Sequence, residues 1–310
     1  MKICFFGSDD FSLAVAEHIH KAGFNICCII TKPDAARGRG KAVSQTSIAS
    51  FADSVGIPVL KPASVRNAEF EETLKGFSPD IAAVCSYGKI LPSNILALPK
   101  MGCINVHPSL LPKYRGATPI ETAIMDRTYE TGITIFQMDA GCDTGNIIAS
   151  KAFRMLPEDC RDSLRQRMAP DSAMLLEEVL KKAEKGIMES YPQPVEGASL
   201  TKLIKKADTE IDWTMPAEKI EGLTRALWTA PGARTSIKGR SIIIGPVSKA
   251  AEEAAGEPGT VCGIIKNKGI CVYCGDGAVL LGDIKPEGKK VMTSWQFACG
   301  CKLEKGERIG

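Results

Sequence analysis

The sequence has no hydrophobic run of about 18 residues, which is the length that a membrane-spanning helix requires. Its apolar start, residues 1–6, stops at Gly7-Ser8-Asp9-Asp10 and is too short for a secretory signal peptide. A strong excess of positive charge is also lacking, because 39 Lys and Arg oppose 36 Asp and Glu and leave a net charge of +3. We therefore expect a soluble, cytoplasmic protein with no membrane partner, in which any polyanion binds to a local basic patch.

The glycine-rich and histidine motifs of three large enzyme classes are missing. The first predicted strand is followed by a single glycine, Gly7, where a dinucleotide-binding fold needs G-x-G-x-x-G. Segment 38–41 has neither the spacing nor the Ser or Thr of a phosphate-binding P-loop, and H-E-x-x-H does not occur. The sequence therefore argues against NAD-dependent oxidoreductases, P-loop nucleotide hydrolases and zinc proteases.

Histidine is scarce, and only three are present. His18 and His20 lie two residues apart on a predicted helix, so their side chains point about 200° apart around its axis. They cannot bind one metal ion together, and a solvated helix face explains them. His107 is the one histidine that follows a predicted strand.

The twelve cysteines are scattered, and several lie in apolar runs where cysteine acts as a small hydrophobic residue. This distribution indicates a reducing compartment. Cys271-x-x-Cys274 together with Cys299-x-Cys301 offers four thiols, but the second pair has a one-residue spacer, and both pairs lie near strand-like residues. We therefore expect structural cysteines and no metal.

Short β-rich segments alternate with helical patterns over the first half of the chain. The segments that favour strands are 2–6, 26–31, 57–60, 81–85, 103–106 and 133–137, and those that favour helices are 11–21, 44–55 and 162–185. This alternation predicts an α/β fold with a doubly wound, Rossmann-like, mostly parallel sheet. Ligands of such sheets bind beyond the carboxyl ends of the strands, which directs attention to the residues after 103–106 and 133–137.

The pattern changes at Tyr191-Pro192-Gln193-Pro194, because two prolines favour an extended linker. A helix is predicted over 217–228, and short β-like runs follow at 234–237, 241–247, 259–265, 269–274 and 278–284. Such closely spaced strands suggest a small barrel of the oligonucleotide-binding (OB) type. We expect a catalytic domain over 1–188, a linker over 189–206 and an OB-like domain over 207–310.

Polar residues follow the two strands singled out above. Strand alternation sends Asn105 and His107 to one face, and the turn 139–145 contributes two carboxylates in a D-x-G-x-D-x-G pattern. Taken alone, His107 could equally be a core histidine with satisfied hydrogen bonds. The turn could likewise be held together by its own aspartates.

Segments 105–116 and 139–145, with the interval between them, resemble the 10-formyltetrahydrofolate-dependent formyltransferases. The resemblance implies catalysis by Asn105, His107 and Asp143, with Asp143 orienting His107 and favouring its protonated form. It also implies 10-formyltetrahydrofolate as formyl donor, no metal, and a Leu111–Pro112 peptide that is cis. The folate-binding residues that it implies are Tyr87, Gly88, Lys89, Ile90, Leu91, Ser109, Leu110, Leu111, Pro112, Asp139 and Gly141.

Three further segments, the basic insertion 31–41 and segments 207–213 and 285–292, are similar to the branch of this family that formylates methionyl-initiator-tRNA. The resemblance then covers nearly the whole chain, although the spacing in 227–233 departs from it. It implies an initiator tRNA partner. We also expect a monomer. The tRNA-binding residues that it implies are Arg37, Arg39, Lys41, Lys202, Lys205, Lys206, Lys289 and Lys290. The alternatives are a formyltransferase for an amino-sugar nucleotide and a non-catalytic RNA-binding module.

Overall fold

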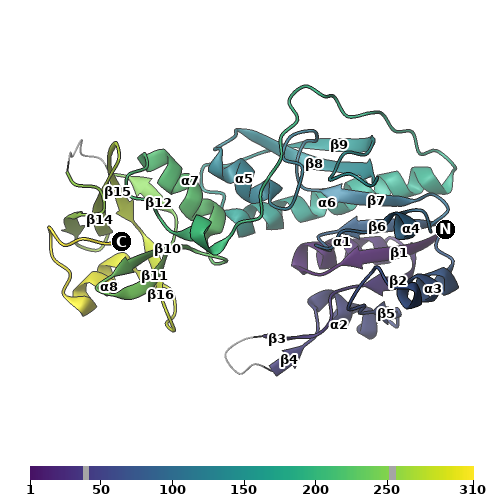
Figure 1. Cartoon of the computed structure of the whole chain (residues 1–310), viewed down its shortest axis with the longest axis horizontal. Helices are drawn as coiled ribbons and strands as arrows, with labels where there is room; N and C mark the ends of the chain where they lie inside the picture. Colours follow the sequence, from purple (N-terminus) through teal and green to yellow (C-terminus); the bar gives the residue numbers. More distant parts are fainter. Residues whose placement is uncertain (38–41, 251–255) are drawn as a thin grey trace. The chain divides into compact units, whose positions relative to one another are not determined.

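A seven-stranded sheet organises the first part of the chain in the computed structural model, which describes residues 1–37, 42–250 and 256–310 (Figure 1). In spatial order its strands are β5 (Val59–Leu60), β2 (Asn25–Ile30), β1 (Lys2–Gly7), β6 (Ile81–Cys85), β7 (Cys103–His107), β8 (Glu130–Gln137) and β9 (Ile147–Arg154). The first five are parallel to their neighbours, whereas β8 and β9 pair antiparallel. The predicted mostly parallel sheet is confirmed, and β9 was not predicted.

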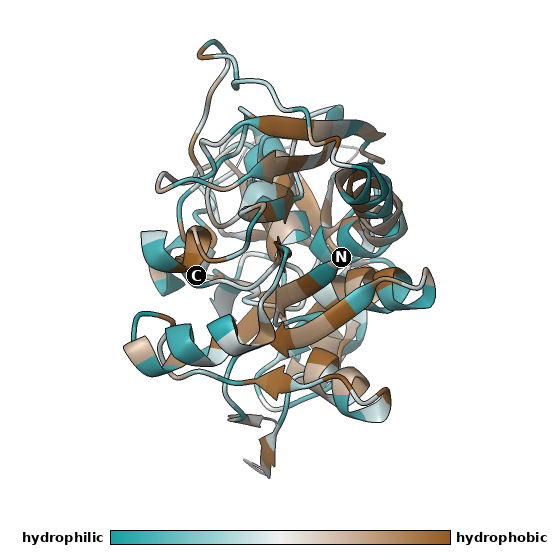
Figure 2. Ribbon diagram, turned by 90° about the vertical axis from the view of Figure 1, so that its right-hand side faces the viewer, coloured by the Kyte–Doolittle hydropathy of each residue, from teal (hydrophilic) through white to brown (hydrophobic). Residues whose placement is uncertain are grey.

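Helices cover both faces of this sheet, which makes it doubly wound. They are α1 (Asp10–Lys21), α2 (Ser47–Ser54), α3 (Ala68–Phe77), α4 (Ser93–Leu96) and α6 (Arg161–Glu184), while α5 (Pro119–Met125) lies between β7 and β8 in the chain. Cys4 and Phe6 of β1 share a core with Phe70 and Leu74 of α3. The alternate residues of β1 are also buried, and α1 packs against β1 and β6. With both faces covered, the inner parallel strands β2, β1 and β6 are apolar over most of their length, and Figure 2 shows brown strands in the interior.

The chain divides into two compact units. Unit 1 comprises residues 1–119, 130–154 and 165–201, and unit 2 comprises residues 120–129, 155–164 and 202–310. Most of the predicted linker therefore belongs to unit 1, where Tyr191 pairs with Ile147 at the start of β9. The domain limits 1–188 and 207–310 stay a proposal.

Unit 2 contains two four-stranded antiparallel sheets besides helix α7 (Ala217–Leu227). One sheet has the order β10 (Ala233–Ile237), β11 (Arg240–Ile244), β16 (Asp283–Pro286) and β17 (Met292–Thr293). The other has the order β12 (Val247–Lys249), β15 (Gly277–Leu281), β14 (Gly269–Cys274) and β13 (Val261–Ile265). The predicted antiparallel β-domain is confirmed, and two of its predicted strands are each divided between the two sheets.

Glycines mark both divisions. Gly245 separates β11 from β12, and Gly282 separates β15 from β16. The Gly245 amide donates to the Asp283 carbonyl at 2.8 Å, and a Cβ on Gly245 would lie 2.7 Å from that oxygen. The two points at which the strands change sheet therefore lie in contact, with no room for a side chain at Gly245. Strands that bend from one sheet into the other are typical of small barrels.

The C-terminal cysteines do not follow the strand-like pattern expected of them. Cys299 and Cys301 lie on helix α8 (Ser294–Cys301), which begins with a capping box of Thr293 and Gln296. All twelve cysteines are free. Over the described residues, no three His, Cys, Asp or Glu side chains are grouped to hold a metal ion, and no helix has the length and apolarity to cross a membrane.

Candidate active site

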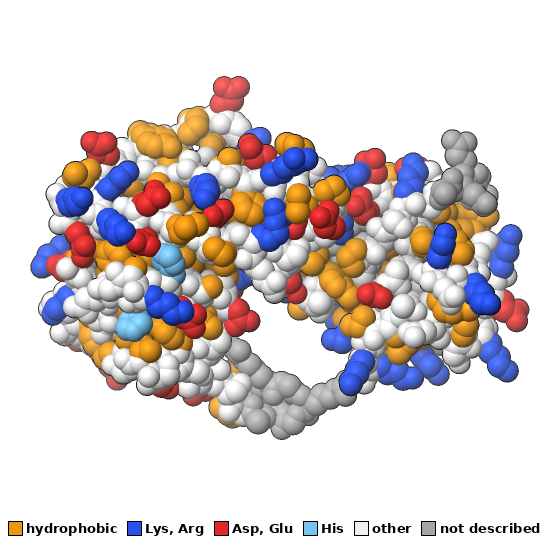
Figure 3. Space-filling model, turned by 180° about the vertical axis from the view of Figure 1, so that it is seen from behind, with side chains coloured by type: hydrophobic (Ala, Val, Ile, Leu, Met, Phe, Trp, Pro, Cys, Tyr) orange, Lys and Arg blue, Asp and Glu red, His pale blue; other side chains and the backbone are white. Residues whose placement is uncertain are grey.

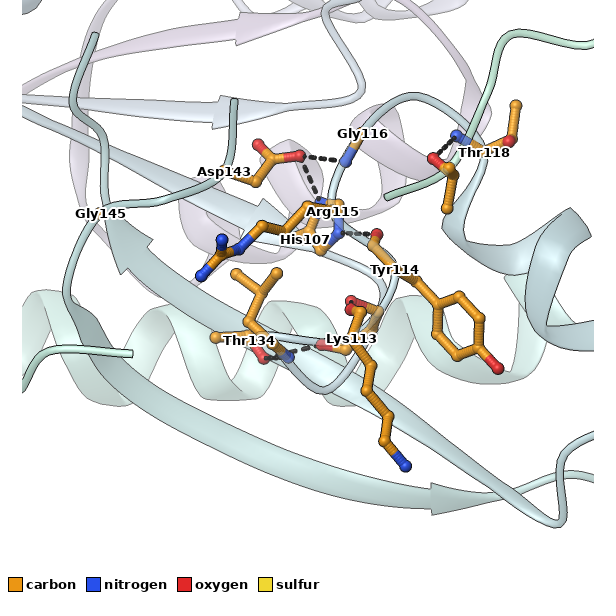
Figure 4. Close-up of polar contacts among 12 residues, drawn as sticks. His107, Lys113, Tyr114, Arg115, Gly116, Thr118, Thr134, Asp143 and Gly145 are labelled. Atoms are coloured by element: carbon orange, nitrogen blue, oxygen red, sulfur yellow. Dashed lines mark hydrogen bonds and ion pairs between the residues drawn. The ribbon is translucent and has the colours of Figure 1, made fainter. Parts of the chain in front are cut away.

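His107 ends strand β7 with its side chain buried in unit 1. Its Nε2 lies 2.9 Å from the Tyr114 carbonyl oxygen, and its Nδ1 lies 3.7 Å from Oδ2 of Asp143 (Figure 4). A carbonyl oxygen only accepts hydrogen bonds, so Nε2 carries a proton and donates it to Tyr114. In the neutral ring, Nδ1 then has the free lone pair and faces Asp143.

Burial sets the charge of this imidazole. Loss of solvent lowers the pKa of His107, and the Asp143 carboxylate and the Tyr114 bond oppose that shift without reversing it. Asp143 thus favours the protonated form of His107, as expected, but burial has the larger effect and leaves the pKa below its usual value. The neutral ring has one nitrogen available to accept a proton.

Asp143 reaches His107 by a longer route than the sequence indicates. Strands β7 and β8 are antiparallel, with His107 opposite Thr134 and Ile104 opposite Gln137, so their carboxyl ends lie at opposite edges of the sheet. The turn after β8 must come back by about three residues of strand length, or roughly 10 Å, to bring Asp143 to His107. The two motifs meet because the turn folds back along the sheet.

Asp139 and Asp143 have different parts in this turn. Oδ1 of Asp139 accepts from the Gly141 amide at 3.0 Å and from the Thr144 hydroxyl at 2.7 Å, which makes the self-contained Asx turn. Asp143 adopts a left-handed backbone with φ 54° and accepts the Gly116 amide on Oδ2 at 2.7 Å. Asp139 and Gly141, expected to bind folate, build the turn that presents Asp143.

The loop after His107 is ordered by buried hydroxyls. Ser109 Oγ donates to the Lys113 carbonyl at 2.7 Å, and Thr134 Oγ1 donates to the Ser109 carbonyl at 2.7 Å and accepts from the Leu111 amide at 3.1 Å. The Leu111–Pro112 peptide is cis, as predicted. The side chains of Ser109, Leu111 and Pro112 are buried, while Leu110 is half-buried.

Asn105 lies two residues before His107 on β7, and strand alternation places both on one face. Its residue is half-buried, between Val84 of β6 and Phe136 of β8 in register. The amide of Asn105 and the imidazole of His107 are therefore neighbouring side chains on one face of the strand.

Tyr87 and Leu91, which were predicted to bind folate, belong to one core cluster of unit 1. The Tyr87 ring is 1% exposed and packs edge-to-face against Phe6, with 5.3 Å between the ring centroids. Burial raises the pKa of Tyr87 to about 12, and its hydroxyl has no hydrogen-bond partner among the residues that the structure describes. These two buried side chains support the loop 87–91 and are not accessible to a ligand. The residues between them are more exposed.

The residues between Tyr87 and Leu91 are Gly88, Lys89 and Ile90. Lys89 Nζ donates to the carbonyls of Pro62 and Ala63 at 3.0 and 3.1 Å. Ile90 is 78% exposed, which is unusual for an isoleucine in a unit with a large core. The loop is thus anchored by Lys89 and offers an exposed apolar side chain.

The basic residues expected to bind tRNA fall into two groups. Arg39 and Lys41 lie outside the described residues, as does the side chain of Arg37, whose backbone belongs to β3 (Ala35–Arg37) in a hairpin with β4 (Ala42–Ser44). The others are exposed residues of unit 2, namely Lys202, Lys205, Lys206, Lys289 and Lys290. In Figure 3, Lys and Arg side chains outnumber acidic ones on the visible face of unit 2.

Residues from 193 to 201 also border the site, and sequence reasoning missed them. Gln193 bonds to the Asp143 turn, Ser199 Oγ accepts the Tyr114 amide at 2.8 Å, and Thr201 Oγ1 accepts the Thr118 amide at 3.1 Å. The available signal was a single Gln between two prolines, a pattern that by itself indicates only an extended segment.

Comparison with known proteins covers nearly the whole chain. A formyl transferase family matches residues 1–180, and a formyl transferase C-terminal domain family matches residues 203–302. Methionyl-tRNA formyltransferase of Agathobacter rectalis is 39% identical over 306 residues, which are 99% of this chain and 98% of the relative. The enzyme of that name from Dictyoglomus turgidum is 40% identical over 313 residues, covering 100% and 99%.

A solved structure shares the fold. HypX from Aquifex aeolicus, crystallised in complex with tetrahydrofolic acid, superimposes with a TM-score of 0.69 at 16% identity. The match covers 100% of this chain and 50% of that protein, and at this identity it supports the fold alone.

Proposed function

This chain belongs to the methionyl-tRNA formyltransferase family, and we propose that it transfers the formyl group of 10-formyltetrahydrofolate to the α-amine of methionyl-initiator-tRNA. The observation that carries the proposal is the pair of the buried His107 and the half-buried Asp143, in a chain that resembles these enzymes from end to end. An acyl transfer of this kind needs a group that takes a proton from the attacking amine and donors that stabilise an oxyanion.

His107 would supply the proton transfer. The neutral amine attacks the formyl carbon, its nitrogen gives a proton to the free Nδ1, and that proton then passes to N10 as the bond between N10 and carbon breaks. Asp143 lies 3.7 Å from Nδ1, so its charge stabilises the imidazolium that forms during the transfer. The Tyr114 carbonyl keeps the other ring nitrogen protonated throughout.

Asn105 would stabilise the negative charge on the formyl oxygen. Its amide lies on the same strand face as His107, two residues away. One such donor is worth about 2.7–4 kcal/mol in the transition state of acyl transfer. The carboxamide and the imidazole thus act on neighbouring atoms of one tetrahedral intermediate.

For the folate we propose a site between the Gly88–Ile90 loop and the cis-proline loop. Ile90 and the half-buried Leu110 offer apolar surface, and the backbone of the two loops offers donors and acceptors for a heterocycle edge. The donor is inferred from the formyltransferase family. No metal is needed for a reaction that the imidazole, carboxylate and amide can support.

For the tRNA we propose phosphate contacts by the exposed lysines of unit 2, Lys202, Lys205, Lys206, Lys289 and Lys290. Arg37, Arg39 and Lys41 of the basic insertion are proposed to reach the acceptor end. We also propose that the enzyme acts as a monomer, which light scattering of the purified protein would test.

The decisive experiment offers the wild-type protein 10-formyltetrahydrofolate with either methionyl-initiator-tRNA or an amino-sugar nucleotide. We expect formylated methionine on the tRNA and no change in the sugar. Formylation of the sugar alone would overturn the acceptor assignment. Binding of tRNA without formyl transfer would support the alternative of a non-catalytic RNA-binding module.

A further inference from the structure

The side chain of Gln193 joins the turn that carries Asp143 to the loop that carries Arg115. Its Nε2 donates to the carbonyl oxygens of Asp143 and Gly145, at 2.8 Å each. Its Oε1 accepts from Nε and Nη2 of Arg115 at 3.0 and 2.7 Å. Both donors and both acceptor positions of this amide are therefore used.

We propose that Gln193 is a positioning residue for formyl transfer, which locks the turn of Asp143 to the loop of Arg115 and so maintains the His107–Asp143 pair. The inference rests on the proposed function, since it concerns how the same site is held. Gln193 itself is placed to touch the turn and the loop, and no step of the reaction is assigned to it.

The need for a lock follows from the backbone of Asp143. Its left-handed conformation, with φ 54°, is sparsely populated for residues other than glycine and persists only where the surroundings impose it. The Gly116 amide binds the Asp143 side chain, while Gln193 binds the Asp143 main chain. Because Arg115 and Gly116 are adjacent, both attachments connect the turn to one short segment.

The segment that carries Gln193 also holds the histidine side of the pair. Ser199 Oγ accepts the amide of Tyr114, and the carbonyl of Tyr114 accepts the proton of His107 Nε2. The backbone of Ser199 adds bonds to the Pro112 carbonyl at 3.1 Å and from the Arg115 amide at 2.9 Å. Gln193 and Ser199 are therefore bonded to the turn that carries Asp143 and to Tyr114, the residue whose carbonyl holds the imidazole.

Only a carboxamide satisfies this position. A glutamate there could still accept from Arg115, but it has no N–H for the two carbonyls and would bring a negative charge against them. A leucine of similar size would remove all four bonds and leave the Arg115 guanidinium and both carbonyls without these partners. Gln193→Glu therefore removes the contacts to the Asp143 turn and keeps those to Arg115, whereas Gln193→Leu removes both sets.

The test compares formylation kinetics of the full-length wild type with Gln193→Glu and Gln193→Leu, using Val195→Ala as matched control. Val195 lies in the same segment and is 92% exposed, so its truncation leaves the contacts of Gln193 in place. We expect kcat to fall about 10- to 100-fold in both Gln193 variants, with KM for folate and tRNA within about twofold of wild type. A kcat within twofold of wild type in both variants would overturn the proposal.

A double-mutant cycle with Asp143→Asn tells positioning from general destabilisation. If Gln193 acts through Asp143, Gln193→Leu costs much less in the Asp143→Asn background than in wild type. Losses that simply multiply would show that Gln193 does not act through Asp143, and would overturn the proposal.

A spectroscopic readout keeps this inference separate from the proposed reaction. The chain has three histidines, so the ring nitrogens of His107 can be followed by NMR in 15N-histidine-labelled protein. We expect the His107 resonances to shift in Gln193→Glu, and to stay in place in Val195→Ala. If the wild type fails to formylate tRNA, the proposed function is wrong, but the shift of the His107 resonances still tests the positioning role of Gln193. Unshifted resonances in Gln193→Glu would overturn that positioning role and leave the proposed function intact.

Discussion

The Tyr114 carbonyl oxygen accepts a hydrogen bond from His107 Nε2 at 2.9 Å, and this one contact decides which ring nitrogen is free. Because Nε2 must hold its proton, the lone pair of the neutral ring is at Nδ1, facing the carboxylate of Asp143. The acid–base chemistry proposed for this site depends on that orientation, since only Nδ1 can take up a proton.

Asp143→Asn keeps the size of the side chain and removes its charge. The carboxylate raises the pKa of His107 against the effect of burial, so its loss lowers that pKa further. We expect kcat to fall about 10²- to 10⁴-fold, because the imidazolium formed in the reaction loses its partner. Steady-state formylation across pH measures both effects, and a variant with wild-type kcat would remove Asp143 from the reaction.

His107 also makes stability depend on pH. Its pKa in the folded protein is below the value of about 6.5 expected when unfolded, so the unfolded chain binds more protons. The stabilising contribution is complete above about pH 6.5 and is lost as pH falls towards the folded pKa. Urea unfolding of wild type and His107→Gln from pH 7.5 to 5 should show a smaller loss in the variant; equal slopes would contradict this prediction.

Gly116→Ala should damage the site from its backbone. Gly116 has φ +110°, and a Cβ there would lie 2.8 Å from Thr201 Oγ1, beside the amide that holds Asp143. Gly197→Ala is the matched control, because Gly197 has φ +78° with nothing within 4 Å of its added Cβ. We expect the control to lose about 1 kcal/mol of stability from backbone strain alone. Gly116→Ala should lose more, together with most of its activity, in denaturation and formylation assays.

Ile90 and Leu91 are adjacent and should respond in opposite ways. Leu91 is 4% exposed, so Leu91→Ala should cost about 2–5 kcal/mol in the free energy of unfolding. Ile90→Ser should leave stability nearly unchanged and raise KM for the folate, because the exposed side chain has no core contacts to lose. Thermal unfolding and folate titration measure the two. An unchanged KM in Ile90→Ser would exclude Ile90 from the folate site.

Local patterns predicted most of the elements. The strands at β1, β6 and β14 and the long helix α6 agree closely with their hydrophobic periodicity. Helices α4 and α5 were missed because they are short, and α3 because only Phe70 and Leu74 are buried along its length. Helix α8 was missed because its cysteine-containing segment has little helical periodicity. Strand β9 lies at the sheet edge, where polar residues interrupt the apolar pattern.

The sequence by itself determined the chemistry available to this protein and its family, because side-chain types, motif spacing and strand periodicity are properties of neighbouring residues. Only the tertiary structure decided that β8 runs antiparallel to β7, that burial lowers the pKa of His107, and that Gln193 is hydrogen-bonded to the Asp143 turn. Each of these depends on residues far apart in the chain. A pKa shifted by burial and an amide whose partners come from two distant segments have no local signature, because the groups that determine them become neighbours only on folding.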